Sequence, residues 1–183
     1  MTIQEMRRAV CAWSKQCYKE QLFAGTSGNL SVYDREKGLM VITPTSVAYE
    51  TIEPEDMVVL RLDGEVTEGR YRPSSEWRMH AAVYEAKEEV SALIHTHSPY
   101  ATAFAVNNRG IPPILIEMVP FLGGDVPLAK YATPGTRAVG DEAVRALEGR
   151  HGCLLANHCV LAAGDSLERA HLRAVYIEDA AKI

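Results

Sequence analysis

The stretch SALIHTHSPYATAFAV, Ser91–Val106, joins a strand pattern to two histidines. Its residues 92–94 are all apolar, and such a short run predicts a buried strand. His95 and His97 follow with one residue between them, and residues two apart in a strand point to the same face of a sheet. Zinc accepts imidazole nitrogens at about 2.0–2.1 Å, so two imidazoles on one face are suited to a shared metal ion. The segment therefore predicts a buried strand with a candidate metal site at its end.

The segments around this strand alternate between helical and strand patterns. Apolar residues three and four apart predict an opening helix over about residues 3–22, and Ser98-Pro99 is typical of a helix start directly after the histidines. Hairpins are predicted from Asn29 through LMVITPT and around Asp63-Gly64. Further strands are predicted in IPPILIEMV, residues 111–119, and in GCLLANHCVLAA, residues 152–163, with helices after RPSSEW, over TRAVGDEAVRALEGR and toward Ile183. Helices mixed with hairpins favour a mixed α/β chain, either an α+β fold or a three-layer sandwich, with a mostly antiparallel sheet and not a purely parallel one.

Length and composition favour one globular domain over residues 1–183, of which 47% are apolar. The net charge of −5 and the absence of a Lys/Arg cluster argue against a nucleic-acid partner. No apolar run approaches the length of a membrane span, and the charged, helical start is unlike a signal peptide, so we expect a cytoplasmic protein without a membrane partner. The four cysteines form no C-x-x-C pair, and we interpret them as reduced and mostly buried.

Two further residues stand at element ends where they suit the candidate site. His158, in LLANHCV, ends another apolar strand, and Glu76 begins the helix that precedes the two histidines. His80 lies four residues after Glu76 on the same helix face, where it would be able to support Glu76, but we interpret it as a packed histidine. A strand-end histidine is more often a hydrogen-bonded structural residue than a ligand. From the residues alone, a metal site and structural histidines both remain open.

Hydroxyl-rich turns are the second unusual feature of the sequence. GTSGN, residues 25–29, TPTS, residues 43–46, and the pair Ser74-Ser75 all fall at junctions between predicted elements. Glycines and free N–H groups at helix starts form anion cradles, and hydroxyl and amide side chains add donors. Each turn alone is also explained by ordinary turn and cap chemistry. Three such turns beside a candidate metal site suggest a phosphate ester as the ligand.

Seven short motifs occur in an order and spacing that are typical of one family. They are GTSGNLSV, ITPT, PSSEWRMH, HTHSPYATAFA, GGDVP, YATPGT and LLANH. Together they resemble the class II aldolase/adducin family, which includes aldolases and sugar-phosphate 4-epimerases, along nearly the whole chain. The resemblance implies a three-layer α/β/α sandwich around a mostly antiparallel central sheet. It also implies a homotetramer with active sites between neighbouring subunits.

The same resemblance implies roles for individual residues. It implies one zinc ion per chain, with other divalent metals as alternatives, held by His95, His97 and His158. Glu76 would approach this ion and act as the acid/base. The implied phosphate pocket consists of Thr26, Asn29, Ser74 and Ser75, closed by Thr45 and Ser46 of the TPTS turn.

The acid after the serine pair favours one branch of this family. The aldolases resemble SSE at this point, whereas the epimerases tend to carry aspartate, and this chain has Glu76. The resemblance therefore implies a zinc-dependent aldolase that cleaves a ketose 1-phosphate to dihydroxyacetone phosphate and an aldehyde through a metal-bound enediolate. A 4-epimerase or a dehydratase of a sugar phosphate on the same scaffold is an alternative. A non-catalytic, adducin-like binding domain is another, and it would be expected to carry a decayed metal site.

The sequence departs from the family pattern at several positions. Cys159 and Ser46 stand where members usually or often have glycine. Fuculose-phosphate aldolases lend a tyrosine across the subunit interface from the strand before GG, and this chain has Glu117 at or near that position. Relatives continue into a tail with a further functional tyrosine, whereas this sequence stops at Ile183. Tyr131, next to the ATPGT loop, is another candidate site residue, with a structural role as the alternative.

Overall fold

An eight-stranded sheet forms the centre of the structure, a computed structural model that describes residues 1–183. Its strands run in the order β4-β3-β2-β1-β5-β8-β7-β6. They span β1 (Asn29–Asp34), β2 (Leu39–Ile42), β3 (Val58–Leu60), β4 (Val66–Glu68), β5 (Ala92–Thr96), β6 (Leu128–Ala129), β7 (Gly152–Leu155) and β8 (Val160–Gly164). Every neighbouring pair is antiparallel except β6 and β7. The prediction of a mostly antiparallel sheet is confirmed.

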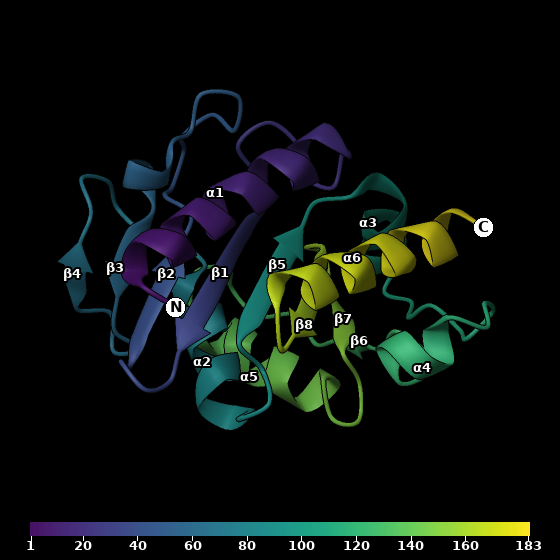
Figure 1. Ribbon diagram of the computed structural model, residues 1–183. Coiled ribbons are helices and arrows are strands. Elements are labelled where there is room, and N and C mark those ends of the chain that lie inside the picture. The colour runs from purple at the N-terminus through teal and green to yellow at the C-terminus, as the bar shows by residue number, and fades with distance from the viewer.

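Helices cover both faces of this sheet (Figure 1). They are α1 (Ile3–Lys19), α2 (Trp77–Ala86), α3 (Pro99–Val106), α4 (Met118–Leu122), α5 (Arg137–Ala146) and α6 (Leu167–Lys182), with a short 3₁₀ helix, η1 (Pro54–Asp56). Residues of α1, α3, α4 and α6 share a core of 28 buried side chains on one face, and α2 and α5 share a separate core of 17 on the other. Because each face has its own helix layer and core, the predicted three-layer α/β/α sandwich is confirmed.

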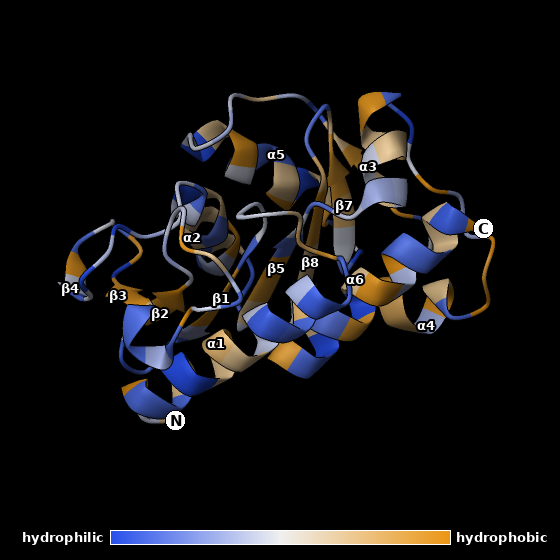
Figure 2. Cartoon of the chain, turned by 90° about the horizontal axis from the view of Figure 1, so that it is seen from above, coloured by the Kyte–Doolittle hydropathy of each residue, from blue (hydrophilic) through white to orange (hydrophobic).

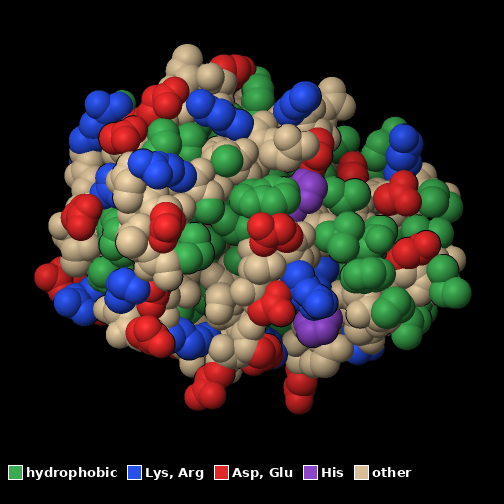
Figure 3. Space-filling model, in the orientation of Figure 1, with side chains coloured by type: hydrophobic (Ala, Val, Ile, Leu, Met, Phe, Trp, Pro, Cys, Tyr) green, Lys and Arg blue, Asp and Glu red, His purple; other side chains and the backbone are tan.

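Helices α1 and α6 expose polar side chains to solvent, and the strands that they cover are apolar. Figure 2 shows blue segments alternating with orange ones along α1 and α6, whereas β2 and β3 are largely orange. In Figure 3, charged side chains are spread over the α1 and α6 face, whereas apolar side chains gather over the region of α4 at the right. None of the helices combines the length and the apolar character that a membrane span requires.

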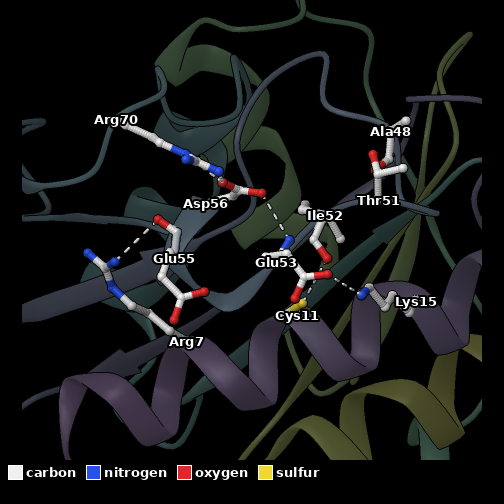
Figure 4. Close-up of polar contacts among 10 residues, drawn as sticks. All are labelled: Arg7, Cys11, Lys15, Ala48, Thr51, Ile52, Glu53, Glu55, Asp56 and Arg70. Carbon is white, nitrogen blue, oxygen red and sulfur yellow. Dashed lines mark hydrogen bonds and ion pairs between the residues drawn. The ribbon is translucent and has the colours of Figure 1, made fainter.

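Polar contacts tie residues 48–56 to α1 (Figure 4). The Cys11 thiol donates to the Ile52 carbonyl at 3.5 Å, and the Lys15 Nζ lies 3.4 Å from Glu53 Oε1. This segment follows the TPTS turn in the chain. Its attachment to a long helix therefore holds one wall of the hydroxyl-rich turns in a fixed place.

Two predicted elements differ from the observed ones. Residues 111–119 do not form a strand, because only Ile111 pairs, in an isolated bridge to Val126, and the two prolines that follow have no N–H for a ladder. The chain turns into α4 instead. The opening helix ends at Lys19, earlier than predicted, since Gln21 adopts a left-handed conformation (φ 63°) that no α-helix continues through.

Candidate active site

Three histidines from two parts of the chain meet where the central strand β5 ends and β8 begins. His95 lies in β5, and His97 follows it closely, with its backbone N–H donating to the Leu22 carbonyl at 2.8 Å. His158 lies in the turn between β7 and β8. Because β8 pairs antiparallel with β5, the start of β8 lies opposite the end of β5 and brings this turn beside it. One ring nitrogen of each histidine lies within 4.8 Å of those of the other two.

The ring nitrogens have the protonation pattern that a metal ligand needs. The His95 Nδ1–H donates to the Val160 carbonyl at 2.7 Å, which leaves a lone pair on Nε2, 3.1 Å from the His97 Nε2. Burial lowers the pKa of His97 to about 4, and it also lowers the pKa values of His95 and His158. The three imidazoles are therefore neutral near pH 7, and neutral imidazole is the form that binds metals.

Two buried polar atoms in this region lack a hydrogen-bond partner. They are the Glu76 Oε2 and the His158 Nδ1. Leaving such an atom unpaired costs about 1–3 kcal/mol, and native folds with unpaired buried atoms often complete them with an ion or ligand. Imidazole nitrogens and carboxylate oxygens are both zinc ligands. The residues present therefore fit a divalent metal ion.

Glu76 lies at the N-terminal end of α2 and is 7% exposed. Its backbone N–H donates to the Ser74 Oγ at 3.3 Å, which helps to fix the start of the helix. Burial raises the pKa of the Glu76 carboxyl, and the backbone N–H of Gly135 partly opposes this shift. A buried carboxyl with a raised pKa beside a cavity is suited to accept and return a proton.

A polar cavity of about 280 Å³ joins these groups to the hydroxyl-rich turns. No hydrophobic residue and no Lys or Arg lines it. Besides Glu76 and the three histidines, all the residues predicted to bind phosphate line its wall: Thr26, Asn29, Thr45, Ser46, Ser74 and Ser75. Hydroxyls, an amide and the N-terminus of α2 provide donors that favour an anion. A divalent metal ion at the histidines would add two positive charges to a cavity that has no Lys or Arg.

Backbone conformation restricts which residues fit at two points of the cavity wall. Gly28 has φ +92°, and a Cβ there would lie 2.4 Å from the Phe23 ring, so only glycine fits. The Gly28 carbonyl also accepts from the Tyr49 hydroxyl at 2.6 Å, which anchors the loop. Ser46 has φ 59°, a left-handed conformation that favours glycine. Serine at this position must therefore tolerate some backbone strain.

Two candidate residues lie away from this cavity. Glu117 precedes α4, Tyr131 is 60% exposed, and neither lines the cavity of its own chain. A role for Glu117 across a subunit interface stays a prediction, as does an approach of Tyr131. Cys159 is buried beside His158, and burial raises the pKa of its thiol to about 11. This thiol is therefore protonated near pH 7 and unsuited to act as a nucleophile, and it is not part of the histidine cluster.

His80 contacts Asn29, and no hydrogen bond joins its ring to the Glu76 carboxyl. The ring is fully buried on α2, and burial lowers its pKa to about 3, so it is neutral. The His80 Nε2 lies 2.6 Å from the Asn29 Oδ1, and the Nδ1 lies 2.7 Å from the Ser31 Oγ. The sequence predicted a packed histidine but not these partners, because they lie on β1, 49 and 51 positions away.

Comparison with known proteins agrees with this arrangement. Residues 8–183 match the family described as Class II Aldolase and Adducin N-terminal domain. The chain is 39% identical over 183 residues to 5-deoxy-D-ribulose 1-phosphate aldolase from Bacillus thuringiensis, covering 100% of this chain and 85% of that protein. It is 39% identical over 143 residues to L-ribulose-5-phosphate 4-epimerase from Salmonella paratyphi B, covering 78% and 60%. A solved structure of L-fuculose 1-phosphate aldolase matches with a TM-score of 0.93 at 39% identity, over 97% of this chain and 84% of that one. The chain belongs to the class II aldolase and adducin family.

Proposed function

We propose that the protein is a zinc-dependent aldolase that cleaves a ketose 1-phosphate between C3 and C4 into dihydroxyacetone phosphate and an aldehyde. The observation that carries this proposal is one polar cavity that joins three neutral histidines, a buried carboxyl and hydroxyl-rich turns. The name of the Bacillus relative supports it, since that protein is a ketose 1-phosphate aldolase. We assign the activity to the cytoplasm, because a charged sugar phosphate does not cross a bilayer unaided.

The three histidines would hold one divalent ion per chain. Zinc suits three imidazole ligands with an open position, although imidazoles also accept manganese and cobalt. When bound, the ion supplies a Lewis acid that stabilises negative charge on substrate oxygens. The hydrogen bond from the His95 Nδ1 to the Val160 carbonyl would orient that ring toward the ion.

The remaining groups act at the two ends of the substrate. The hydroxyls and N–H groups of the turns would bind the phosphate on C1, and the Asn29 amide would add donors. Glu76 would hold the proton that C3 gains when the C3–C4 bond breaks and that C3 loses in the reverse direction. Anchoring the phosphate keeps C3 beside Glu76, which reduces the entropic cost of reaching the transition state.

A sugar-phosphate 4-epimerase is the second candidate, and the Salmonella relative named for that activity supports keeping it. A dehydratase of a sugar phosphate would use the same cavity. Glu76 after the serine pair favours the aldolase, as the family resemblance implies. An adducin-like binding domain without chemistry is disfavoured, because the chain has both the histidine cluster and the buried carboxyl.

Product analysis tests the proposed reaction. The metal-loaded protein is incubated with pentulose, hexulose and 5-deoxypentulose 1-phosphates and with pentulose 5-phosphates, and the products are identified by mass. We expect dihydroxyacetone phosphate from 1-phosphates, with 5-deoxypentulose 1-phosphate among the cleaved substrates. A change of configuration at C4 of a 5-phosphate without cleavage would favour the epimerase. No turnover of either series would contradict both assignments.

We also propose a homotetramer whose active sites lie between subunits. Its support is an apolar surface around α4, formed by Ile114, Ile116 and Val119, which are 51%, 83% and 63% exposed (Figure 3). Exposed apolar patches of this kind are typical of protein contacts. Glu117 lies within this surface, and its approach to a neighbour's cavity is part of the proposal, on the ground of the family resemblance.

The assembly state is expected to depend on this surface. Light scattering should give a particle of four times the 20.1 kDa chain mass, and Ile116→Asp should give smaller particles, because a buried unpaired charge opposes association. Val66→Asp is the control, since Val66 is an exposed apolar residue on β4 at the far end of the sheet. An Ile116→Asp protein of unchanged mass would exclude α4 as the interface.

A further inference from the structure

A chain of four side chains leads from the cavity into the core between β1 and α2. The Asn29 Oδ1 lies 2.6 Å from the His80 Nε2, and the His80 Nδ1 lies 2.7 Å from the Ser31 Oγ. The Ser31 Oγ in turn lies 2.7 Å from the Tyr84 hydroxyl. His80, Ser31 and Tyr84 are fully buried, and Asn29 is 5% exposed and lines the cavity. None of the proposed catalytic steps uses His80.

The positions of the protons along this series of hydrogen bonds follow from the contact between Asn29 and His80 at the cavity. An amide oxygen only accepts hydrogen bonds, so the His80 Nε2 must carry the proton it shares with Asn29. The Nδ1 of a neutral imidazole with a protonated Nε2 has a lone pair, and it accepts the Ser31 hydroxyl proton. The Tyr84 hydroxyl donates to the Ser31 carbonyl at 3.0 Å, and its oxygen also lies 2.7 Å from the Ser31 Oγ. Every proton in the chain has an acceptor.

The contact with the His80 ring gives the Asn29 amide a definite direction. Its oxygen faces the His80 ring, so its NH₂ group occupies the opposite side of the planar amide and is free for the cavity. A phosphate has acceptor oxygens and repels an amide oxygen, so only this orientation is useful for binding it. The opposite tautomer of His80 would accept from the Asn29 NH₂ and turn the amide oxygen outward.

We propose that His80 is a positioning residue that holds the Asn29 amide with its N–H donors toward the substrate phosphate. The inference rests on the proposed function, because it takes the hydroxyl-rich turns as the phosphate site. It extends that function by explaining how an uncharged wall selects an anion. The Ser31 hydroxyl contacts the other ring nitrogen of His80 from within the core.

Phosphate affinity in His80 variants tests this inference without turnover. The dissociation constant of inorganic phosphate is measured by calorimetry on metal-loaded protein. His80→Leu is expected to weaken binding about tenfold to a hundredfold, the loss typical of a hydrogen bond to a charged group. His80→Gln should restore binding to within about threefold, because its amide NH₂ can occupy the place of Nε2–H. In all variants the metal content should stay at the wild-type value.

A control separates positioning from folding. Leu60→Ala removes buried volume from the same core, on β3, and should lower Tm without changing phosphate affinity. Unchanged phosphate affinity in a folded His80→Leu protein would overturn the inference. Where His80→Leu does not fold, nitrogen-15 NMR of the wild-type imidazole replaces it as the test. A proton on Nε2 supports the positioning role, and a proton on Nδ1 overturns it.

The outcomes also distinguish this inference from the proposed reaction. Phosphate binding that depends on His80, in a protein that cleaves no ketose phosphate, would remove the aldolase assignment and keep the role of His80. Ketose cleavage by a protein whose phosphate affinity does not depend on His80 would keep the aldolase assignment and remove the role of His80. Absence of phosphate binding by metal-loaded wild type would overturn the role of His80 directly.

Discussion

Glu76→Gln is expected to lose about 10²–10⁴-fold in kcat while keeping its metal, because a positioned proton-transfer group contributes a factor of that size. Glutamine keeps the shape of the side chain and one oxygen, but it cannot take up a proton. The three histidine rings stay as they are, and the hydrogen bond from the Glu76 backbone N–H to Ser74 does not involve the carboxyl. The loss should therefore fall on chemistry and not on assembly of the site.

Proton exchange on dihydroxyacetone phosphate isolates this step. The compound is incubated with protein in deuterated water without any aldehyde, and NMR follows the C3 protons. Wild type should exchange one of the two protons stereospecifically, and Glu76→Gln should not. Glu85→Gln is the matched control, since it makes the same change at an exposed position of the same helix. Unchanged exchange in metal-loaded Glu76→Gln would remove Glu76 from the proton-transfer role.

The local pattern around the opening histidines predicted more of the structure than any other stretch. An apolar run followed by H-x-H indicated a buried strand, and β5 is buried over its full length. Period-two geometry placed His95 and His97 on one face, and their Nε2 atoms lie 3.1 Å apart. The burial of this strand and the shared face of the two histidines depend on residues that are neighbours in the chain. The sequence alone was therefore sufficient to predict both.

Contacts between distant segments were beyond such reasoning. His158 reaches the other histidines only because β8 pairs with β5, and no local pattern specifies which strands pair. The link from His80 to Asn29 has the same origin, in the packing of α2 on β1. For residues 111–119 the error had another cause: an apolar run is typical of a buried strand, but here much of it lies on the surface. Apolar residues that lie on the surface give the same sequence pattern as apolar residues of a core, so the pattern alone did not distinguish the two.

The hydroxyl-rich turns show what physical chemistry adds to the pattern. Each turn was explained equally well as an ordinary turn, and only the structure shows that GTSGN, TPTS and the serine pair line one cavity. The cavity has no Lys or Arg, so the proposed binding of a phosphate would rest on oriented dipoles and on an ion at the histidines. The phosphate site and the metal site are therefore expected to depend on each other.

Removing a histidine of the cluster should have the largest effect of all. Loss of a residue that merely orients a metal ligand lowers metal affinity about 10–100-fold, so loss of a ligand itself should exceed that range. His95→Ala and His158→Ala should therefore be purified with little metal and with kcat near background. His151→Ala is the control, because His151 lies in the turn before β7 and is not part of the cluster.

Two readouts make this prediction independent of turnover. Elemental analysis should find one ion per wild-type chain and little in either cluster variant. Thermal unfolding supplies the second readout, since an ion that binds only the folded state adds about 2.7 kcal/mol of stability at a concentration of 100 Kd. Added zinc should therefore raise the Tm of chelator-treated wild type and of His151→Ala, but not that of His95→Ala. The three clustered histidines, whose ring nitrogens lie within 4.8 Å of one another, provide the physical reason for this gain. A full complement of metal in the His95→Ala/His158→Ala double variant would show that the ion binds elsewhere, and the proposed chemistry would lose its Lewis acid.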